Sequence, residues 1–332
     1  MRGTAKSLDR RTIALALAAA AFAFALFAPA VPLERPVYRY LFVLDITQSM
    51  NTLDYGTGGR PLSRLAHAKA AIREALRRLP CGSRAGLGVF TEHRTMVLIA
   101  PVEVCGAYTE LVATLERLDW RMSWAGASEV AKGLYSALRL ARALSPAPSV
   151  VFVTDGHEAP PVNPAQRVRF GGEPGEVTGY VIGAGGPKPM PIPKFDMSGK
   201  PLGYWRPEDV VQAPPAGAPG STGDSGGSSA RAPAQPGTEH LSSVKEEHLR
   251  ELARETGLRY RALTTAEDFA EALFVPEWTR PAEVNVSLAP FAAALALVCL
   301  VIACLPPADA AARAVSRLRA ALGRRHIARR SA

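Results

Sequence analysis

Three short apolar runs, separated by amphipathic segments, dominate the middle of the chain. Each run is rich in β-branched or aromatic residues, which is typical of a strand buried inside a parallel sheet. The runs are Tyr38–Leu44 (YRYLFVL), Ser149–Thr154 (SVVFVT) and Gly179–Gly183 (GYVIG). Apolar residues at helical spacing predict helices over Ser63–Leu79, Tyr108–Leu118 and Glu129–Leu144. Strands alternating with helices predict an α/β fold with a doubly wound, mostly parallel sheet of Rossmann-like type.

The rest of the middle region adds a hairpin and a C-terminal α/β unit. Strands over 86–91 and 96–100 are expected to pair across a turn at Glu92–Thr95. A helix over Val244–Glu255, with a capping box at Ser243 and Glu246, precedes an edge strand (258–262) and a helix (266–273). A Pro-rich and Gly-rich insertion at 187–242 interrupts this pattern, and its part 213–237 has too few apolar residues to order itself. These elements define one domain over 32–279.

Two long uncharged runs flank this domain. Thr12–Val31 and Val286–Leu305 each have about the length of a transmembrane helix. The first is also open to interpretation as a cleaved signal sequence, because Ala28-Pro29-Ala30 has the form of a cleavage site. The layout predicted is an N-terminal segment and helix (1–31), the domain, a second helix (284–305) and a basic tail (306–332).

The charges give this layout an orientation. The chain carries 39 Lys and Arg residues against 30 Asp and Glu residues. Residues 32–285 contain 28 of each kind, so the whole excess of +9 lies at the two ends. Since basic residues remain on the cytoplasmic side of a membrane, both termini are expected in the cytoplasm and the domain in the periplasm of a bacterial inner membrane. A nucleic-acid partner is not expected, because the domain has no excess of basic residues.

Residues with carboxylate or hydroxyl side chains stand after two of the expected strands and before one of the expected helices. Asp45, Thr47 and Ser49 stand at alternate positions after the first strand, where an extended loop can turn all three toward one point. Ser128 precedes a helix and Asp155 follows a strand. Because ligand-binding loops of a doubly wound sheet meet at the carboxyl ends of its strands, these five side chains should converge. Hard divalent cations prefer such oxygen ligands.

This constellation resembles the metal-ion-dependent adhesion site (MIDAS) of the von Willebrand factor A family, whose pattern is Asp-x-Ser-x-Ser, a Thr, and an Asp before Gly. The five residues fall on the five positions, with Thr47 in place of the usual Ser and Ser128 in place of the usual Thr. The resemblance implies Mg²⁺, with Ca²⁺ or Mn²⁺ as alternatives, and a protein partner that completes the cation's shell with an Asp or Glu. Asp54, His157 and Glu158 are candidates for the partner-contacting rim.

A closer resemblance links the chain to the membrane-bound A-domain proteins of methanol dehydrogenase clusters, the L-type of Mxa/Mox. It is carried by the strings LDITQSMNTLDY, LPCGSRAGLGVF, APVEVCG, DWRMSWAGASEVAKGL and FVTDGHEAPP. It implies a role in maturing a periplasmic dehydrogenase. Other A-domain proteins and a MoxR-type ATPase would be further partners.

Four cysteines divide between the membrane and the domain. Cys299 and Cys304 lie in the second apolar run and are expected to be small apolar residues there. If the hairpin is centred near His93, residues facing each other sum to 186, as do Cys81 and Cys105. The sequence therefore predicts a disulfide between them, which the periplasm permits.

Two other functions compete with partner capture. A metal-dependent hydrolase is disfavoured, because no nucleophile motif or phosphate-binding loop is present, and the histidines lack zinc-ligand spacing. A membrane scaffold with a degenerate metal site stays open because of the two Ser/Thr exchanges. The prediction is a non-enzymatic binding and assembly factor.

Overall fold

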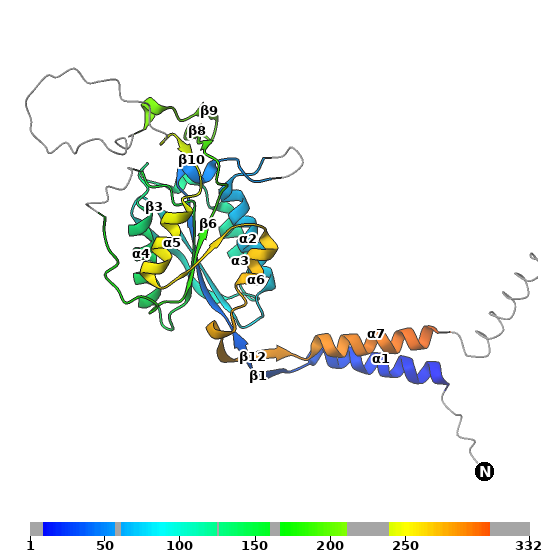
Figure 1. The fold of residues 1–332 in the computed structure, drawn as a ribbon. Coiled ribbons are helices and arrows are strands. Elements are labelled where there is room, and N and C mark those ends of the chain that lie inside the picture. The colour runs from blue at the N-terminus through cyan, green and yellow to red at the C-terminus, as the bar shows by residue number, and fades with distance from the viewer. Residues whose placement is uncertain (1–8, 57–60, 125, 160–166, 211–238, 306–332) are drawn as a thin grey trace, which may run out of the picture. The chain divides into compact units, whose positions relative to one another are not determined.

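The computed structural model describes residues 9–56, 61–124, 126–159, 167–210 and 239–305, and Figure 1 shows their arrangement. The basic tail (306–332), the first eight residues of the N-terminal segment and the stretch 213–237 lie outside the described residues. The chain forms two units: Arg35–Ala282 is one, and the segments before and after it form the other.

The larger unit is built on a six-stranded sheet of order β11-β6-β5-β2-β3-β4. Neighbouring strands run parallel except for β4, which is antiparallel to β3. The strands are β2 (Arg39–Asp45), β3 (Arg84–Thr91), β4 (Arg94–Glu103), β5 (Ser149–Thr154), β6 (Gly179–Gly183) and β11 (Arg259–Ala262). The order reverses beside β2, with β3 on one side and β5 on the other. The doubly wound, mostly parallel α/β sheet is therefore confirmed.

Helices cover both faces of this sheet (Figure 1). One face packs against α2 (Arg64–Arg78), α3 (Tyr108–Arg117) and α6 (Ala266–Ala272), and the other against α4 (Val130–Ala143) and α5 (Glu246–Thr256). Alternate residues of β2 serve the two cores: Tyr40, Phe42 and Leu44 face the first, while Leu41 and Val43 face the second. This period of two explains why the strand is apolar throughout.

A side chain caps the N-terminus of α2, but the N-terminal cap expected for α5 does not form. Ser63 caps α2, since its hydroxyl accepts a hydrogen bond from the N–H of Ala66 at 3.1 Å. The capping box expected at Ser243 and Glu246 does not form, because Lys245 is the N-cap of α5 and no side chain caps that helix.

The hairpin differs from its expected register. Its turn takes only Glu92 and His93, since Thr91 pairs with Arg94, and the residue numbers of paired residues there sum to 185. Two irregularities next to Leu87 raise the sum to 187 at the open end, where Arg84 pairs with Glu103. The predicted sum of 186 holds only for Leu87 and Ile99. Gly86 lies at these irregularities because a Cβ there would stand 2.8 Å from the carbonyl oxygen of Ile99.

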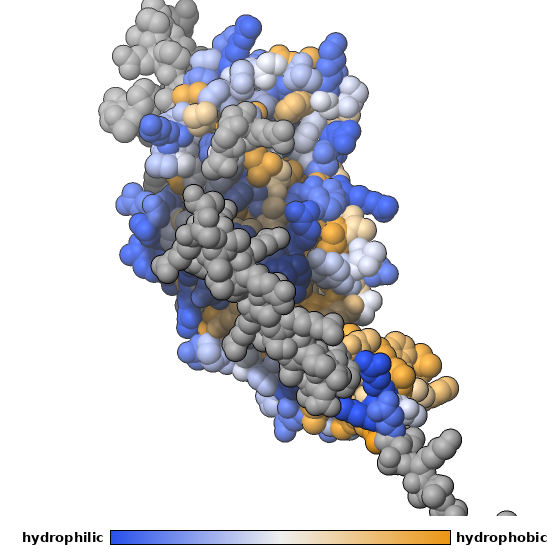
Figure 2. Space-filling view, turned by 90° about the vertical axis from the view of Figure 1, so that its right-hand side faces the viewer, coloured by the Kyte–Doolittle hydropathy of each residue, from blue (hydrophilic) through white to orange (hydrophobic). Residues whose placement is uncertain are grey.

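The smaller unit contains two apolar helices, α1 (Arg10–Phe27) and α7 (Ala289–Cys304), which lie side by side (Figure 1). The buried residues of the two helices are all small: Ala14, Ala18, Ala292, Ala296, Cys299 and Ala303. Strands β1 (Ala30–Val37) and β12 (Arg280–Ser287) pair in a two-stranded sheet. In Figure 2 hydrophobic residues gather on the helix pair, while the visible surface of the domain is mostly hydrophilic.

Two transmembrane helices were expected, and the described residues contain one helix long and apolar enough to span a membrane, α1. Helix α7 has 16 residues. This is below the range of about 17–25 residues that usually spans a membrane, whereas the 18 residues of α1 fall within it. The predicted second span is shortened because residues up to Ser287 belong to strand β12, so the helix starts only at Ala289.

Candidate metal centre

The site lies at the rim where the strand order reverses. Asp45 is the last residue of β2, and Asp155 directly follows the adjacent strand β5. These strands run parallel, with Leu44 paired to Val153, so their carboxyl ends meet. Crevices outside such ends, at the reversal point, are where open α/β sheets bind ligands.

Asp45 is fully buried and accepts hydrogen bonds from hydroxyls and one amide. The backbone N–H and the hydroxyl of Thr47 donate to its Oδ1, at 2.8 and 2.7 Å. The hydroxyl of Thr154 donates to its Oδ2 at 2.6 Å. These contacts fix the carboxylate, but no cationic side chain of the described residues forms an ion pair with it.

Asp155 is also fully buried but has a positive partner. Nη1 of Arg64 donates to its Oδ2 at 2.6 Å, and the hydroxyl of Ser242 donates to the same oxygen at 3.0 Å. The backbone N–H of His157 donates to Oδ1 at 2.9 Å. Both oxygens of this carboxylate are therefore engaged within the chain.

The three hydroxyl candidates are buried around these carboxylates. The Oγ atoms of Thr47 and Ser49 lie 3.4 Å apart. Backbone hydrogen bonds with Ala159, 2.7 and 2.8 Å long, hold Ser128 at the same rim. Although Ser128 is only 3% exposed, its Oγ has no hydrogen-bond partner among the described residues. An unpartnered buried hydroxyl is costly, so its position in a ligand set has a physical rationale.

The two carboxyl groups titrate in opposite directions. Burial, together with the nearby charge of Asp155, raises the pKa of Asp45 to about 7. Burial also acts to raise the pKa of Asp155, but the charge of Arg64, together with His157 and the hydrogen bonds that the carboxylate accepts, lowers that pKa below its ordinary value. At neutral pH the Asp45 carboxyl group is thus partly protonated, unless another positive charge replaces the proton.

This set of donors fits a hard divalent cation. It offers two carboxylates and three hydroxyls from three loops, all oxygen, which suits Mg²⁺ and the related cations. The unpartnered Ser128 hydroxyl and the high pKa of Asp45 both favour a positive ligand there.

The three rim candidates have different surroundings. Asp54 accepts two hydrogen bonds from Arg64, at 2.7 and 2.9 Å, and its side chain is 7% exposed. The carboxylate of Glu158 accepts from the N–H groups of Val130 and Ala131 at the start of α4. This geometry argues against a direct partner contact for either acid. His157 is buried, and its Nδ1 has no partner among the described residues.

Arg64 is a central residue that the sequence analysis missed. Its side chain is fully buried and joins Asp54, Asp155 and Ser242 in one network. The available signal was its position, the first residue of α2 after the N-cap Ser63, where a helix dipole disfavours a cation. A cation at that position needs nearby anions.

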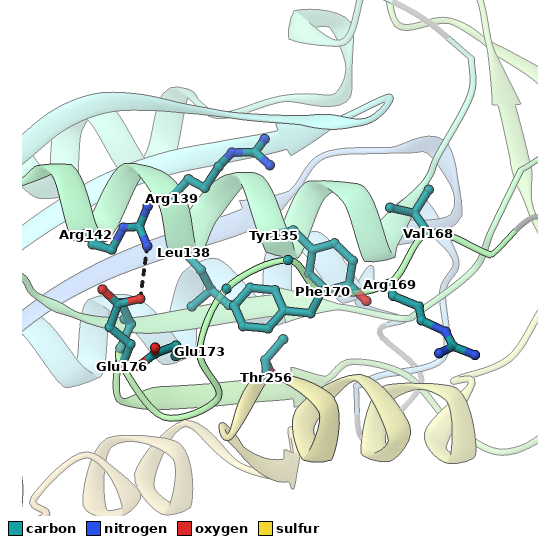
Figure 3. A pocket seen from close by; sticks show the side chains of 13 residues that line it. Tyr135, Leu138, Arg139, Arg142, Val168, Arg169, Phe170, Glu173, Glu176 and Thr256 are labelled. Carbon is teal, nitrogen blue, oxygen red and sulfur yellow. Dashed lines mark hydrogen bonds and ion pairs between the residues drawn. The ribbon is translucent and has the colours of Figure 1, made fainter.

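A cleft of about 400 Å³ opens over the site. Its lining includes Thr47, Ser49 and Ser128, so the candidate ligands face a space that a second molecule can enter. His157 and Glu158 also line it. A second cavity, of about 280 Å³, lies along α4 beside Tyr135, Arg142 and Phe170 (Figure 3). None of the candidate site residues lines this second cavity.

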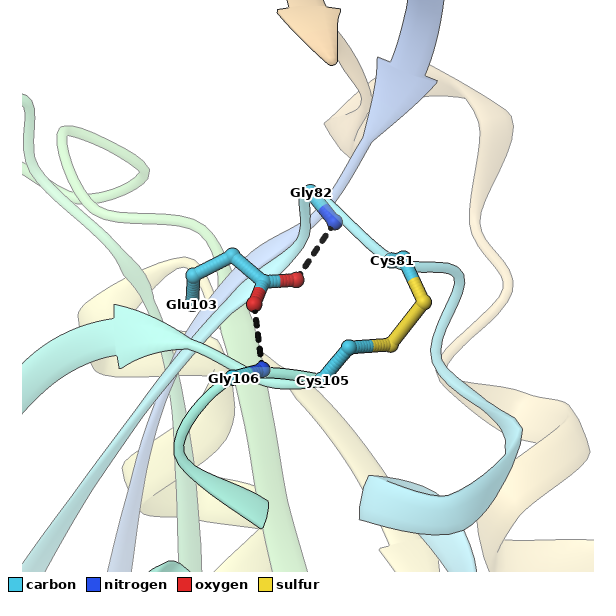
Figure 4. The surroundings of a disulfide bond; sticks show 5 residues. All are labelled: Cys81, Gly82, Glu103, Cys105 and Gly106. Atoms are coloured by element: carbon cyan, nitrogen blue, oxygen red, sulfur yellow. Dashed lines mark hydrogen bonds between the residues drawn. A yellow bond between two sulfur atoms is a disulfide. The ribbon is translucent and has the colours of Figure 1, made fainter. Parts of the chain in front are cut away.

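The disulfide lies at the other end of the sheet. Cys81 and Cys105 are bonded, with Cα atoms 5.3 Å apart, in the turns just outside β3 and β4 (Figure 4). Beside them, the carboxylate of Glu103 accepts from the N–H groups of Gly82 and Gly106, at 2.7 and 2.6 Å. The described free cysteines are Cys299 and Cys304 of α7.

Comparison with known families identifies the domain. Residues 40–157 match the family model of the von Willebrand factor type A domain, which together with the sheet order assigns this part of the chain to that class. The match begins in β2 and ends two residues after Asp155. No curated protein matches the chain.

Solved structures with similar folds share little sequence with this chain. An aerotolerance-related membrane protein from Bacteroides fragilis has 17% identity and a TM-score of 0.44, covering 71% of this chain and 96% of its own. The protein BatB from Bacteroides thetaiotaomicron has 16% identity and a TM-score of 0.45, covering 71% and 95%. A von Willebrand factor type A protein from Catenulispora acidiphila has 13% identity and a TM-score of 0.37, covering 74% and 49%. Similarity this low does not indicate what the chain binds.

Proposed function

We propose that this protein is a membrane-anchored binding factor whose A domain holds a divalent cation and captures a partner protein through an Asp or Glu side chain. The observation that carries the proposal is the buried, unpartnered hydroxyl of Ser128, which lines the same cleft as Thr47, and Thr47 is hydrogen-bonded to the buried Asp45. A bound cation, Mg²⁺ first and Ca²⁺ or Mn²⁺ as alternatives, would supply the positive charge that a partner carboxylate needs.

The residues of the site would have different roles in holding the cation. Thr47, Ser49 and Ser128 line the cleft and would offer hydroxyl oxygens, while the fully buried Asp45 and Asp155 would contribute negative charge beneath it. Arg64 keeps Asp155 ionised and in place. The backbone hydrogen bonds between Ser128 and Ala159 hold the loop of Ser128 against the segment that follows Asp155.

A binding role is favoured over hydrolysis by the state of Glu158. This carboxylate lines the cleft, but it is held by two N–H groups of α4 and by His248 at 3.0 Å. It therefore caps a helix and is poorly placed to accept a proton from water. The proposal is a protein that binds and does not catalyse.

The anchor and the compartment are part of the proposal. Helix α1 begins with two basic residues, Arg10 and Arg11, which favour a cytoplasmic N-terminus and a periplasmic domain. The disulfide between Cys81 and Cys105 suits that oxidising compartment. The motif strings shared with methanol dehydrogenase clusters suggest that the partner is a periplasmic dehydrogenase in the course of maturation.

The test is capture of the partner from solubilised membranes with and without chelator. Asp45→Ala removes a cation ligand and should weaken capture by about 2–4 kcal/mol, roughly 30- to 1000-fold. EDTA should release the same protein from the wild type. Asp268→Ala, at an exposed position on α6, is the matched control and should capture normally. If capture is indifferent to both EDTA and Asp45→Ala, the proposal fails.

A further inference from the structure

The first half of the insertion folds into an arm, residues Met190–Val210, that lies beside the metal centre. Strands β8 (Pro193–Phe195) and β9 (Pro201–Tyr204) form its hairpin, and the N–H of Trp205 donates to the carbonyl of Ile192 at 3.0 Å. Strand β7 (Met190–Pro191) pairs with β10 (Leu241–Ser242) and joins the arm to the domain.

Side chains fix the arm against the loop that carries the candidate ligands. The indole Nε1 of Trp205 donates to Oε1 of Gln48 at 2.7 Å, and Gln48 stands between Thr47 and Ser49. Lys194 lies over the Trp205 ring, with its Nζ 4.5 Å from the ring centroid. On the arm's other side, the rings of Phe195 and Trp120 stack at 5.9 Å. The Trp205 ring is therefore held in one orientation before any partner arrives.

The arm gives the cleft an apolar wall beside its polar floor. Ile192, Trp205 and Val210 of the arm, with the acidic Asp209 between the last two, line the same 400 Å³ space as Thr47 and Ser128. Pockets of this size, roughly 300–1,000 Å³, hold whole small ligands, so a carboxylate alone leaves most of the space unfilled. A rigid, half-buried tryptophan at the edge of a polar centre is the type of residue that carries binding energy at interfaces.

We propose that the cleft recognises two adjacent side chains of an extended partner segment: an Asp or Glu, and next to it a large apolar residue that packs on Ile192 and Trp205. The carboxylate half of this inference rests on the proposed function. The recognition of the apolar residue is new. It predicts that the arm favours those exposed Asp or Glu residues of a partner that have a large apolar neighbour.

The experiment uses the full-length protein in detergent and fluorescein-labelled hexapeptides in an anisotropy titration with Mg²⁺. Gly-Gly-Asp-Leu-Gly-Gly should bind about tenfold or more tightly than Gly-Gly-Asp-Ser-Gly-Gly, because burying a leucine side chain yields an effect of that order. Trp205→Ala should bring the ratio of the two dissociation constants close to one, and Trp205→Phe should retain most of it. Tyr204→Ala, at an exposed neighbouring position on the arm that does not line the cleft, is the matched control and should leave the ratio unchanged.

Each contrary result has a distinct meaning. Equal affinity of the wild type for both peptides, with binding abolished by EDTA, would overturn the apolar half and leave the proposed function intact. If neither peptide binds, or if the preference for leucine persists in EDTA, the metal-based capture is wrong, and this inference fails with it.

Discussion

The two carboxylates of the metal centre are equally buried, yet their surroundings differ. Asp155 receives the guanidinium of Arg64, the hydroxyl of Ser242 and an N–H, and its pKa is lowered. Asp45 receives two hydroxyls and one N–H, its pKa is raised to about 7, and the nearby Ser128 hydroxyl has no partner. The fold thus supplies a counter-charge to one carboxylate and leaves the other to a ligand.

The largest expected effect comes from removing Arg64, the positive partner of Asp155. Arg64→Met removes the buried cation between Asp54 and Asp155 and leaves two carboxylates without their partner, which should lower the free energy of unfolding by about 3–5 kcal/mol. Urea denaturation measures this. Arg73→Met is the matched control, because that arginine is 49% exposed in its ion pair with Glu116, and it should cost less than about 1 kcal/mol. Equal losses in the two variants would show that Arg64 has no special role.

The disulfide provides a contrast between stability and binding. Replacing Cys81 and Cys105 by serine opens a loop with a sequence separation of 24 and should destabilise the protein by about 3 kcal/mol. The cysteines lie near the amino end of β3, whereas the metal centre lies at the carboxyl ends of β2 and β5. Cation affinity should therefore stay unchanged, and a large loss of affinity would contradict this separation.

Asp45, which has no cationic partner among the described residues, should make the free energy of unfolding depend on pH when divalent cations are absent. The folded-state pKa of Asp45, about 7, lies above its ordinary value of 3.8, so folding favours the protonated form. This stabilisation is fully present below about pH 4 and is lost as the pH rises toward 7, by at most about 1.4 kcal/mol per pH unit. Urea denaturation in EDTA at several pH values should show this slope in the wild type relative to Asp45→Asn. Parallel curves for the two proteins would refute it.

Much of the fold is predictable because the apolar pattern and the burial agree. Runs such as Ser149–Thr154 and Gly179–Gly183 are buried along their whole length, so continuous hydrophobicity predicts them as inner strands. The hairpin register was less predictable, because the irregularities next to Leu87 depend on tertiary packing and not on a local pattern. The second span was overestimated, because hydropathy does not show that a strand occupies its first residues.

The candidate site, too, is predictable from the sequence only where local spacing or strand order determines it. Asp45, Thr47 and Ser49 stand at alternate positions of one loop and can be recognised by that spacing, and strand order then predicts Asp155 beside them. Arg64 and Ser242 come from distant segments, and their role depends on a buried network that no spacing reveals. The arm is harder still, because its strands have only two to four residues and its place follows from contacts such as Trp205 with Gln48.

The smallest effect concerns the exchanged hydroxyl. Ser128→Thr keeps an oxygen at the same atom position, so cation affinity should stay within about threefold of the wild type. Ser128→Ala removes the unpartnered oxygen and should weaken the binding by roughly tenfold, as expected for the loss of one polar contact of about 1.4 kcal/mol. If Ser128→Ala binds the cation as the wild type does, that hydroxyl is not a ligand.

The central claim is that a bound divalent cation supplies the positive charge that Asp45 lacks among the described residues. Calorimetric titration of Mg²⁺, Ca²⁺ and Mn²⁺ into the full-length protein in detergent, for the wild type and for Asp45→Asn, tests it most directly. We expect one bound cation per chain in the wild type, with a proton released near pH 7 as the cation replaces it on Asp45, and at least tenfold weaker binding in the variant. A wild type that binds none of the three cations, or binds them as Asp45→Asn does, would contradict the account and favour a scaffold with a degenerate site.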